Sequence, residues 1–355
     1  MSSIVKPRTI RVDASTICQL RCPECPNGRR ELNKSDVGSG FLQLNDFDSL
    51  LDQSPWVSEV DLTSWGETFL NPDLLDILRS AFLRKLRVTA GSNLNGIRRE
   101  LLEGIVRYRL LSLNCSIDGA THETYARYRV NGNFEEVMDN IKEINYFKKR
   151  NNSKYPILKW QFLVFGYNEH EILQARKRAE SLGMEFVLAL PFNTDFPLGR
   201  PLDCEFSPVM DKELVREELG YSSHIECKEK YGRYPVQGAC QALWVQPTIN
   251  WNGTVMGCCA TRFGFGGNAF REGLLASINN EKMQYARLML TGKMPARDDI
   301  PCSDCTLYLE MADSGQWLKR SFVYRALRFT YGNINLPYST TRRIYRSLHL
   351  NRFWE

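Results

Sequence analysis

The chain has 355 residues, 43% of them hydrophobic and 25% charged, which is ordinary for a globular protein of one large or two smaller domains. It contains no apolar run of about 18 residues, so no transmembrane helix is encoded, and its first residues lack the apolar core of a signal peptide. We therefore expect a cytoplasmic protein. The net charge of +5 is too small to indicate a nucleic-acid-binding protein.

Strand-like and helix-like segments alternate over residues 1–195, which is typical of a parallel sheet built from βα units. Short apolar runs predict strands at residues 8–15, 57–64, 86–93, 110–118, 157–166 and 184–192. Apolar residues at helical spacing predict helices at residues 42–54, 72–85, 97–109, 133–150 and 169–183. The sequence therefore predicts an α/β fold with a parallel sheet.

Three regions follow the alternating part. Residues 196–238 are irregular and contain prolines, so we expect a linker with one short helix. Residues 239–306 carry cysteines, and apolar alternation around Asn252-Gly253 predicts a β-hairpin there. Residues 307–355 are aromatic and basic, with eight Lys or Arg against three Asp or Glu. This tail is expected either to pack over the barrel as a helical extension or to contact an anionic substrate or an acidic membrane surface.

The cysteines point to metal chemistry. An odd count of eleven, without an export signal, argues against a complete disulfide framework. Cys18, Cys22 and Cys25 follow the first predicted strand with C-x3-C-x2-C spacing. Three thiolates are one ligand short of a structural zinc site or a fully ligated iron–sulfur cluster. We therefore expect one of two sites. Either a zinc ion takes its fourth ligand from a distant residue, or an iron–sulfur cluster leaves one iron free to bind a cofactor.

The segment CQLRCPEC resembles the cysteine signature of radical S-adenosylmethionine (SAM) enzymes, with Glu24 where that family usually has an aromatic residue. The resemblance covers about residues 8–195 and implies a partial (β/α)6 TIM-like barrel. It also implies that Cys18, Cys22 and Cys25 hold a 4Fe-4S cluster whose fourth iron binds SAM. In that family SAM is cleaved to a 5′-deoxyadenosyl radical, which takes a hydrogen atom from the substrate.

Further segments resemble motifs of the same family in the same order. They are WGETFLNPD, GSNLNG, LNCSIDGATHETYARYRVNGNF and VFGYNEHEI, and each follows or ends a predicted strand, where barrel enzymes build their sites. The resemblance assigns SAM-binding roles to seven residues: Gly66, Glu67, Asn93, Ser116, Asp118, Arg129 and Asn168. Among them, Glu67 would accept from the SAM amino group. A guanidinium such as that of Arg129 can pair bidentately with the SAM carboxylate.

A second cysteine set lies near the C-terminal end. Cys258 follows Gly253 by five positions, and a closely spaced pair follows after a gap of 43 residues. This arrangement resembles the twitch domain, a shortened SPASM domain that pairs a β-hairpin with a helix. The resemblance implies one auxiliary 4Fe-4S cluster held by Cys240, Cys258, Cys302 and Cys305. A four-cysteine zinc ribbon is the alternative.

The two cysteine sets narrow the reaction class. A fully ligated auxiliary cluster can accept an electron but cannot bind substrate directly. The chain therefore resembles twitch-type oxidoreductases and epimerases of sugars, aminocyclitols and related hydroxylated molecules. Dehydrogenation would use the cluster as electron acceptor, whereas epimerisation would need a hydrogen-atom donor, for which Cys259 and Cys115 are candidates. Strand alternation directs Cys115 toward the helices if Ser116 faces the barrel interior.

The remaining expectations concern substrate and partners. Asn193 and Asp195, at the end of the sixth predicted strand, are candidates to contact a small-molecule substrate. The resemblance also implies an external one-electron reductant such as flavodoxin or ferredoxin. A peptide-modifying SPASM-type maturase is the alternative, although a first strand near residue 8 leaves no room for an N-terminal peptide-recognition domain. A non-catalytic iron–sulfur or zinc protein is a more distant alternative.

Overall fold

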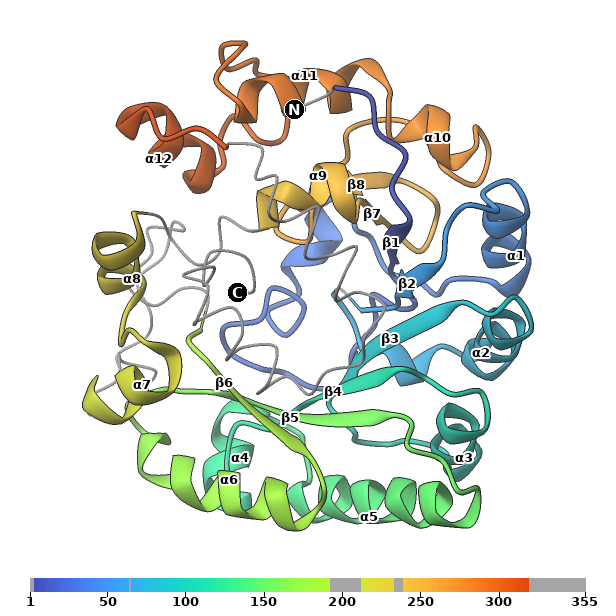
Figure 1. The fold of residues 1–355 in the computed structure, drawn as a ribbon, viewed down its shortest axis with the longest axis vertical. Coiled ribbons are helices and arrows are strands. Elements are labelled where there is room, and N and C mark those ends of the chain that lie inside the picture. The colour runs from blue at the N-terminus through green and yellow to red at the C-terminus, as the bar shows by residue number, and fades with distance from the viewer. Residues whose placement is uncertain (1–2, 64, 192–211, 233–238, 319–355) are drawn as a thin grey trace.

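One curved sheet of eight strands forms the centre of the computed structural model, which describes residues 3–63, 65–191, 212–232 and 239–318 (Figure 1). The order is β6-β5-β4-β3-β2-β1-β7-β8. The strands are β1 (Thr9–Val12), β2 (Glu59–Asp61), β3 (Arg87–Ser92), β4 (Ser112–Ser116), β5 (Ile157–Leu163), β6 (Glu185–Ala189), β7 (Thr248–Ile249) and β8 (Val255–Gly257). All neighbours are parallel except the antiparallel pair β7 and β8.

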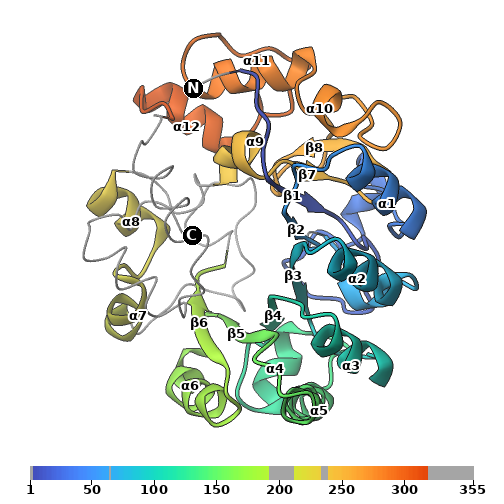
Figure 2. The ribbon, with the colours of Figure 1, turned by 45° about the vertical axis from the view of Figure 1, so that its right-hand side comes forward.

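Helices between the first six strands cover the outer side of this sheet (Figures 1 and 2). They are α1 (Leu44–Asp52), α2 (Leu74–Leu83), α3 (Arg99–Arg107), α4 (His122–Tyr128), α5 (Phe134–Arg150) and α6 (Ile172–Ser181). Parallel neighbours joined through helices confirm the predicted α/β fold and its partial barrel. The short helix α4 was not predicted from apolar spacing, and it begins after Thr121, whose hydroxyl caps the Thr124 N–H.

The two faces of the sheet differ in polarity. Along β5, burial alternates, and the buried residues include Trp160 and Phe162. Trp160 packs against Phe134 of α5, which shows that this face meets the helices. The intervening residues Lys159 and Gln161 are partly exposed on the opposite, inner face. Strand alternation therefore gives the sheet an apolar outer face and a polar inner face.

The second cysteine-bearing segment joins the same sheet. Its hairpin turns at Gly253, with φ of +88°, a conformation that glycine adopts without strain. The hairpin prediction at Asn252-Gly253 is thereby confirmed. The sequence did not show that β7 would pair in parallel with β1, through Arg11 opposite Thr248. This pairing places the second segment directly beside the first strand of the barrel.

The other helices are α7 (Lys212–Leu219), α8 (His224–Tyr231), α9 (Ala242–Val245), α10 (Leu274–Ser277), α11 (Glu281–Leu290) and α12 (Thr306–Ser314). The region 196–238 thus has two helices in its described part, where one was expected. Asn193, Asp195 and the tail residues 319–355 lie outside the described residues. Within the described ranges, no helix is both long and apolar enough to cross a membrane.

Candidate functional site

The three-cysteine loop follows β1 and lies at the carboxyl end of the sheet. Cys22 is 5% exposed, and Cys18 and Cys25 are partly exposed. The loop turns tightly, because the Cys25 N–H donates to the Cys22 carbonyl at 3.1 Å. Tyr128 and Phe165 form an apolar wall beside these cysteines, with ring centroids 4.8 Å apart. The open cysteine set therefore has one shielded side and one accessible side.

Two nitrogen donors point at sulfurs of this loop. The Nη1 of Arg129 lies 3.7 Å from the Sγ of Cys22, and the Nδ2 of Asn93 lies 3.8 Å from the Sγ of Cys18. Burial raises the pKa of Cys18 to about 12, so that thiol is protonated at neutral pH in the protein alone. Metal ligands are thiolates, and N–H donors stabilise their negative charge. The residues therefore fit an iron–sulfur cluster held by Cys18, Cys22 and Cys25.

Glu67 lies after β2 and is almost completely buried, with 2% of its surface exposed. Its carboxylate accepts from the Asn93 N–H at 2.7 Å and from the Ser92 hydroxyl at 2.8 Å. Burial raises the pKa of Glu67, although these donors act in the opposite direction. The preceding Gly66 packs so tightly that a Cβ would lie 2.4 Å from the Ser15 carbonyl oxygen. Glu67 therefore joins the ends of β2 and β3 beside the cysteine loop.

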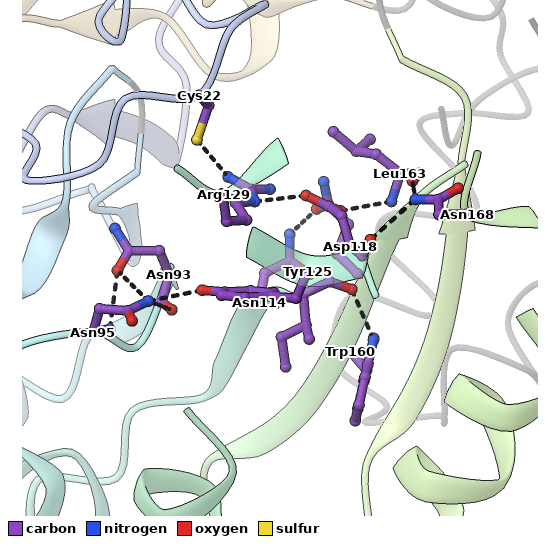
Figure 3. A network of polar contacts seen from close by, with 12 residues as sticks. Cys22, Asn93, Asn95, Asn114, Asp118, Tyr125, Arg129, Trp160, Leu163 and Asn168 are labelled. Atoms are coloured by element: carbon purple, nitrogen blue, oxygen red, sulfur yellow. Dashed lines mark hydrogen bonds and ion pairs between the residues drawn. The ribbon is translucent and has the colours of Figure 1, made fainter. Parts of the chain in front are cut away.

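Asp118 and Arg129 form a buried ion pair at the end of β4 (Figure 3). Arg129 Nε donates to Asp118 Oδ2 at 2.5 Å, and Asp118 Oδ1 accepts from the Leu163 N–H at 2.8 Å. Asn168 donates to the backbone carbonyl of Asp118 at 3.0 Å and is fully buried. The network connects the ends of β4 and β5 to Cys22. The structure thus brings Arg129 from the fourth motif to the first cysteine motif.

The four cysteines of the second set also converge. Cys240 and Cys302 are buried, and Cys258 and Cys305 are partly buried. Burial raises the pKa of Cys240, and the neighbouring thiols of the other three cysteines raise it further. Within the described ranges, no three His, Cys, Asp or Glu side chains lie close enough together to hold a single metal ion. A cluster of four irons spaces its ligand sulfurs more widely, so four mutually interacting thiols fit that group.

The two hydrogen-donor candidates lie in different surroundings. Cys115 is completely buried in the main core, and its sulfur is 3.8 Å from the Leu113 carbonyl oxygen. Ser116 is partly exposed on the opposite face of β4, as strand alternation predicts. Cys259 is partly exposed and lies near Arg11 of β1. Burial lowers the pKa of Arg11, but Asp61 and, to a smaller extent, Cys259 raise it, so the net shift is upward. Of the two thiols, Cys259 is thus the one beside the barrel interior.

Three contacting residues were not identified from the sequence. Gln19 donates to the Asn95 carbonyl at 2.7 Å and to the Asn93 side chain at 3.1 Å. The Asn95 amide donates to the Tyr125 hydroxyl at 2.8 Å. Asn95 lies within the segment GSNLNG, so its motif was visible, but its partners depend on tertiary contacts. These bonds hold the cysteine loop to the ends of β3 and α4.

Comparisons with known proteins agree with this geometry. Residues 12–179 match the model of the radical SAM superfamily, and residues 240–306 match that of an iron–sulfur cluster-binding domain, SPASM. A curated relative, the AdoMet-dependent heme synthase of Methanosarcina barkeri, is 28% identical over 137 residues. That match spans 38% of this chain and 38% of the relative.

Two solved structures share the fold at low sequence identity. SuiB from Streptococcus suis, bound to its precursor peptide SuiA, superposes with a TM-score of 0.57 at 14% identity over 78% of this chain and 66% of SuiB. Histidine-tagged anSMEcpe with bound AdoMet gives a TM-score of 0.51 at 12% identity over 87% of this chain and 97% of that chain. A radical SAM domain implies a 4Fe-4S cluster and SAM, and a SPASM domain implies further iron–sulfur cluster binding. Residues 12–179 thus match a radical SAM domain, and residues 240–306 match a SPASM-type iron–sulfur cluster-binding domain.

Proposed function

We propose that this protein is a radical SAM oxidoreductase or epimerase that acts on a sugar, an aminocyclitol or a related hydroxylated small molecule. The observation that carries the proposal is the polar inner face of the sheet. Arg11 and Asp61 form an ion pair there at 2.9 Å, and the Asn114 amide donates to Gln161. All four residues are partly exposed. The interior of a closed TIM barrel is instead filled by branched apolar side chains.

These polar groups suit a substrate that is rich in hydroxyl groups. The carboxylate of Asp61 has two acceptor oxygens, and the guanidinium of Arg11 has several N–H donors. The amides of Asn114 and Gln161 offer both kinds of group on the neighbouring part of the same face. A hydroxyl group donates once and accepts twice, so each pair can bind it without leaving a buried polar atom unsatisfied.

The cofactors supply the reactive species. When bound, SAM and its cluster generate a radical that removes a hydrogen atom from a substrate carbon. Cys18, Cys22 and Cys25 would hold that cluster, and Cys240, Cys258, Cys302 and Cys305 would hold the auxiliary one. Asn93 and Arg129 would stabilise the thiolates of the first site through the contacts described above. Our proposed SAM-binding residues are these two and five others at the same edge of the sheet: Gly66, Glu67, Ser116, Asp118 and Asn168.

Cys259 distinguishes the two possible outcomes. Epimerisation requires a hydrogen-atom donor near the substrate, and Cys259 lies beside Arg11 at the inner face. Dehydrogenation requires no such thiol. An external one-electron reductant, of the flavodoxin or ferredoxin type, would supply the electron in either case.

A peptide-modifying reaction is the second candidate. The observation that favours it is the fold similarity to SuiB, whose structure contains a precursor peptide. The inner face would then bind one side chain of a peptide instead of a free small molecule.

A product analysis in D2O tests the proposal. The reconstituted protein is incubated with SAM, a reductant and a panel of glycosides, aminocyclitols and peptides, and the products are analysed by mass spectrometry. A product with one deuterium in place of hydrogen indicates epimerisation, and a product lighter by two hydrogens indicates dehydrogenation. Modification of peptides alone would overturn the small-molecule proposal. Cys18→Ala is the control that should abolish both products, and Cys259→Ala should abolish only epimerisation.

Iron content tests the two-cluster assignment separately. About eight irons per chain are expected for two 4Fe-4S clusters. About four irons per chain in the wild-type protein would exclude the auxiliary cluster.

A further inference from the structure

A chain of ion pairs connects the two cysteine-bearing parts of the molecule. Arg262 Nη1 lies 2.8 Å from Glu31 Oε2, and Glu31 Oε1 accepts from Arg29 Nε at 2.6 Å. Arg29 Nη1 then lies 3.4 Å from Glu24 Oε2. The four charges alternate in sign along this path, so each neighbouring contact is attractive.

The ends of this chain lie next to cysteines of both sets. Glu24 directly precedes Cys25, and Arg262 follows Cys258 by four positions. Glu24 is also the residue at which the first cysteine motif departs from the aromatic residue usual in its family. The chain of ion pairs therefore gives this unusual residue a definite partner.

Backbone hydrogen bonds reinforce the same connection. The Asp36 N–H donates to the Arg262 carbonyl at 3.0 Å, and the Gly264 N–H donates to Asp36 Oδ2 at 2.8 Å. On the hairpin side, Trp251 Nε1 donates to the Val37 carbonyl at 2.9 Å. The Trp251 ring covers Gly40 so closely that a Cβ there would lie 2.5 Å from it. The segment after the first cysteine motif is thus held by the second domain along its length.

The side chains of these ion pairs are partly buried. Glu24 and Arg29 have side chains that are 10% and 22% exposed, whereas Glu31 and Arg262 are 35% and 40% exposed. An isolated exposed pair contributes little to stability, but a network with partly buried members holds its side chains in one geometry. Its main effect is therefore to restrict the motion of the loop that it holds.

We propose that Glu31 and Arg262 are positioning residues that hold the SAM-cluster loop, residues 22–31, against the second domain. They act through Arg29, whose backbone N–H donates to the Cys25 carbonyl at 3.0 Å. The geometry at Cys22 and Cys25 consequently depends on the presence of the second domain. This inference concerns the loop only and stands whatever the substrate is.

Hydrogen exchange of the reconstituted full-length protein, measured anaerobically, tests this role. Arg262→Gln removes the ion pair between Arg262 and Glu31 and leaves the backbone and Trp251 contacts in place, and we expect the amides of residues 22–31 to exchange about fivefold faster. Arg262→Lys keeps the charge and should show a smaller increase. Glu31→Gln should match Arg262→Gln or exceed it, because Glu31 also binds Arg29. The amides of residues 22–31 should exchange no faster in the double variant than in Glu31→Gln, because both substitutions break the same ion pair.

Arg297→Gln is the matched control. Arg297 forms an ion pair with Glu281 at 2.5 Å in the same domain, but it does not contact the SAM-cluster loop. It should leave exchange at residues 22–31 unchanged. A second readout is the electron paramagnetic resonance spectrum of the reduced SAM cluster, recorded after SAM is added. Its lines should be broader in Arg262→Gln than in wild type and should be unchanged in Arg297→Gln. Wild-type exchange in both Arg262→Gln and Glu31→Gln, or an equal increase in Arg297→Gln, would overturn the proposal.

Discussion

The guanidinium of Arg129 donates through Nε to the Oδ2 of Asp118 at a distance of 2.5 Å, and both side chains are largely buried. The Asp118 side chain is completely inaccessible, so its charge depends on this partner. The same guanidinium reaches Cys22 through Nη1. One arginine therefore contacts both a buried carboxylate and the sulfur of Cys22, a proposed cluster ligand.

Replacing Arg129 by Gln should destabilise the protein strongly. It leaves the Asp118 carboxylate buried without a counter-charge, a change that typically costs about 3–5 kcal/mol. The urea midpoint of the reconstituted protein should fall, and adding Asp118→Asn to the same chain should restore part of the loss. A double variant no more stable than Arg129→Gln alone would show that the ion pair is not the cause.

Glu226 of α8, outside the two cysteine sets, provides a pH-dependent prediction. It accepts from Arg216 Nε at 2.6 Å and from the Ser222 hydroxyl at 2.6 Å, which ties α8 to the end of α7. The hydrogen bond from Arg216 lowers the pKa of Glu226 to about 2 from its ordinary value of 4.5. A depressed pKa means that the stabilisation is complete above pH 4.5 and is lost as the pH falls toward 2.

The test compares Glu226→Gln with wild type by urea unfolding at several pH values. The variant should be less stable near neutral pH, and the difference should shrink as the pH falls below 4.5. Glu229→Gln, exposed on the same helix, is the control and should show no such difference. A deficit that stays constant down to about pH 3 would contradict the assignment of the stabilisation to the Glu226 carboxylate.

Gly28→Ala should selectively disrupt the first cluster site. A Cβ at this position would lie 2.3 Å from the Cys22 carbonyl oxygen, and a backbone atom cannot move aside as a side chain can. Iron per chain should fall from about eight to about four, because only the auxiliary site remains intact. Gly104→Ala is a matched control, since its added methyl group meets the flexible Leu75 side chain. Full iron loading in Gly28→Ala would show that the loop accommodates the methyl group.

The sequence predicted the parts of the fold that depend on local pattern. Apolar spacing located α1, α2, α3, α5 and α6. Cysteine spacing divided the cysteines into a set of three and a set of four, and their roles as open and closed ligand sets stay predictions. The Asn252-Gly253 turn was equally local, because a two-residue hairpin loop favours these residue types.

Features that depend on tertiary contact were not predicted. The parallel pairing of β7 with β1 joins residues far apart in the chain, and no local pattern encodes it. Gln19 and Asn95 meet only once the strand ends are assembled. From the sequence, Glu24 was only a departure from a motif. The structure shows that it ends a chain of ion pairs that runs through Arg29 and Glu31 to Arg262.

Arg287 of α11 gives the last prediction, because two opposing effects meet there. It is 1% exposed, and the acceptors of its hydrogen bonds within the described part of the chain are uncharged oxygens. They are the carbonyls of Ser3, Leu243 and Ile278 and the side chain of Asn279. Burial lowers the pKa of Arg287 to about 10, which still leaves it charged at neutral pH.

Arg287→Met should reduce stability by about 3 kcal/mol, because each buried carbonyl left without a donor costs about 1–3 kcal/mol and only part of this is offset by removing a buried charge. The urea midpoint measures the effect, and Arg271→Met, at an exposed position, is the control. If Arg287→Met were as stable as wild type, the free-energy cost of desolvating the guanidinium would equal the stabilisation from its hydrogen bonds. The expected loss instead identifies Arg287 as the donor that joins the N-terminal segment at Ser3 to α9, the helix that follows Cys240.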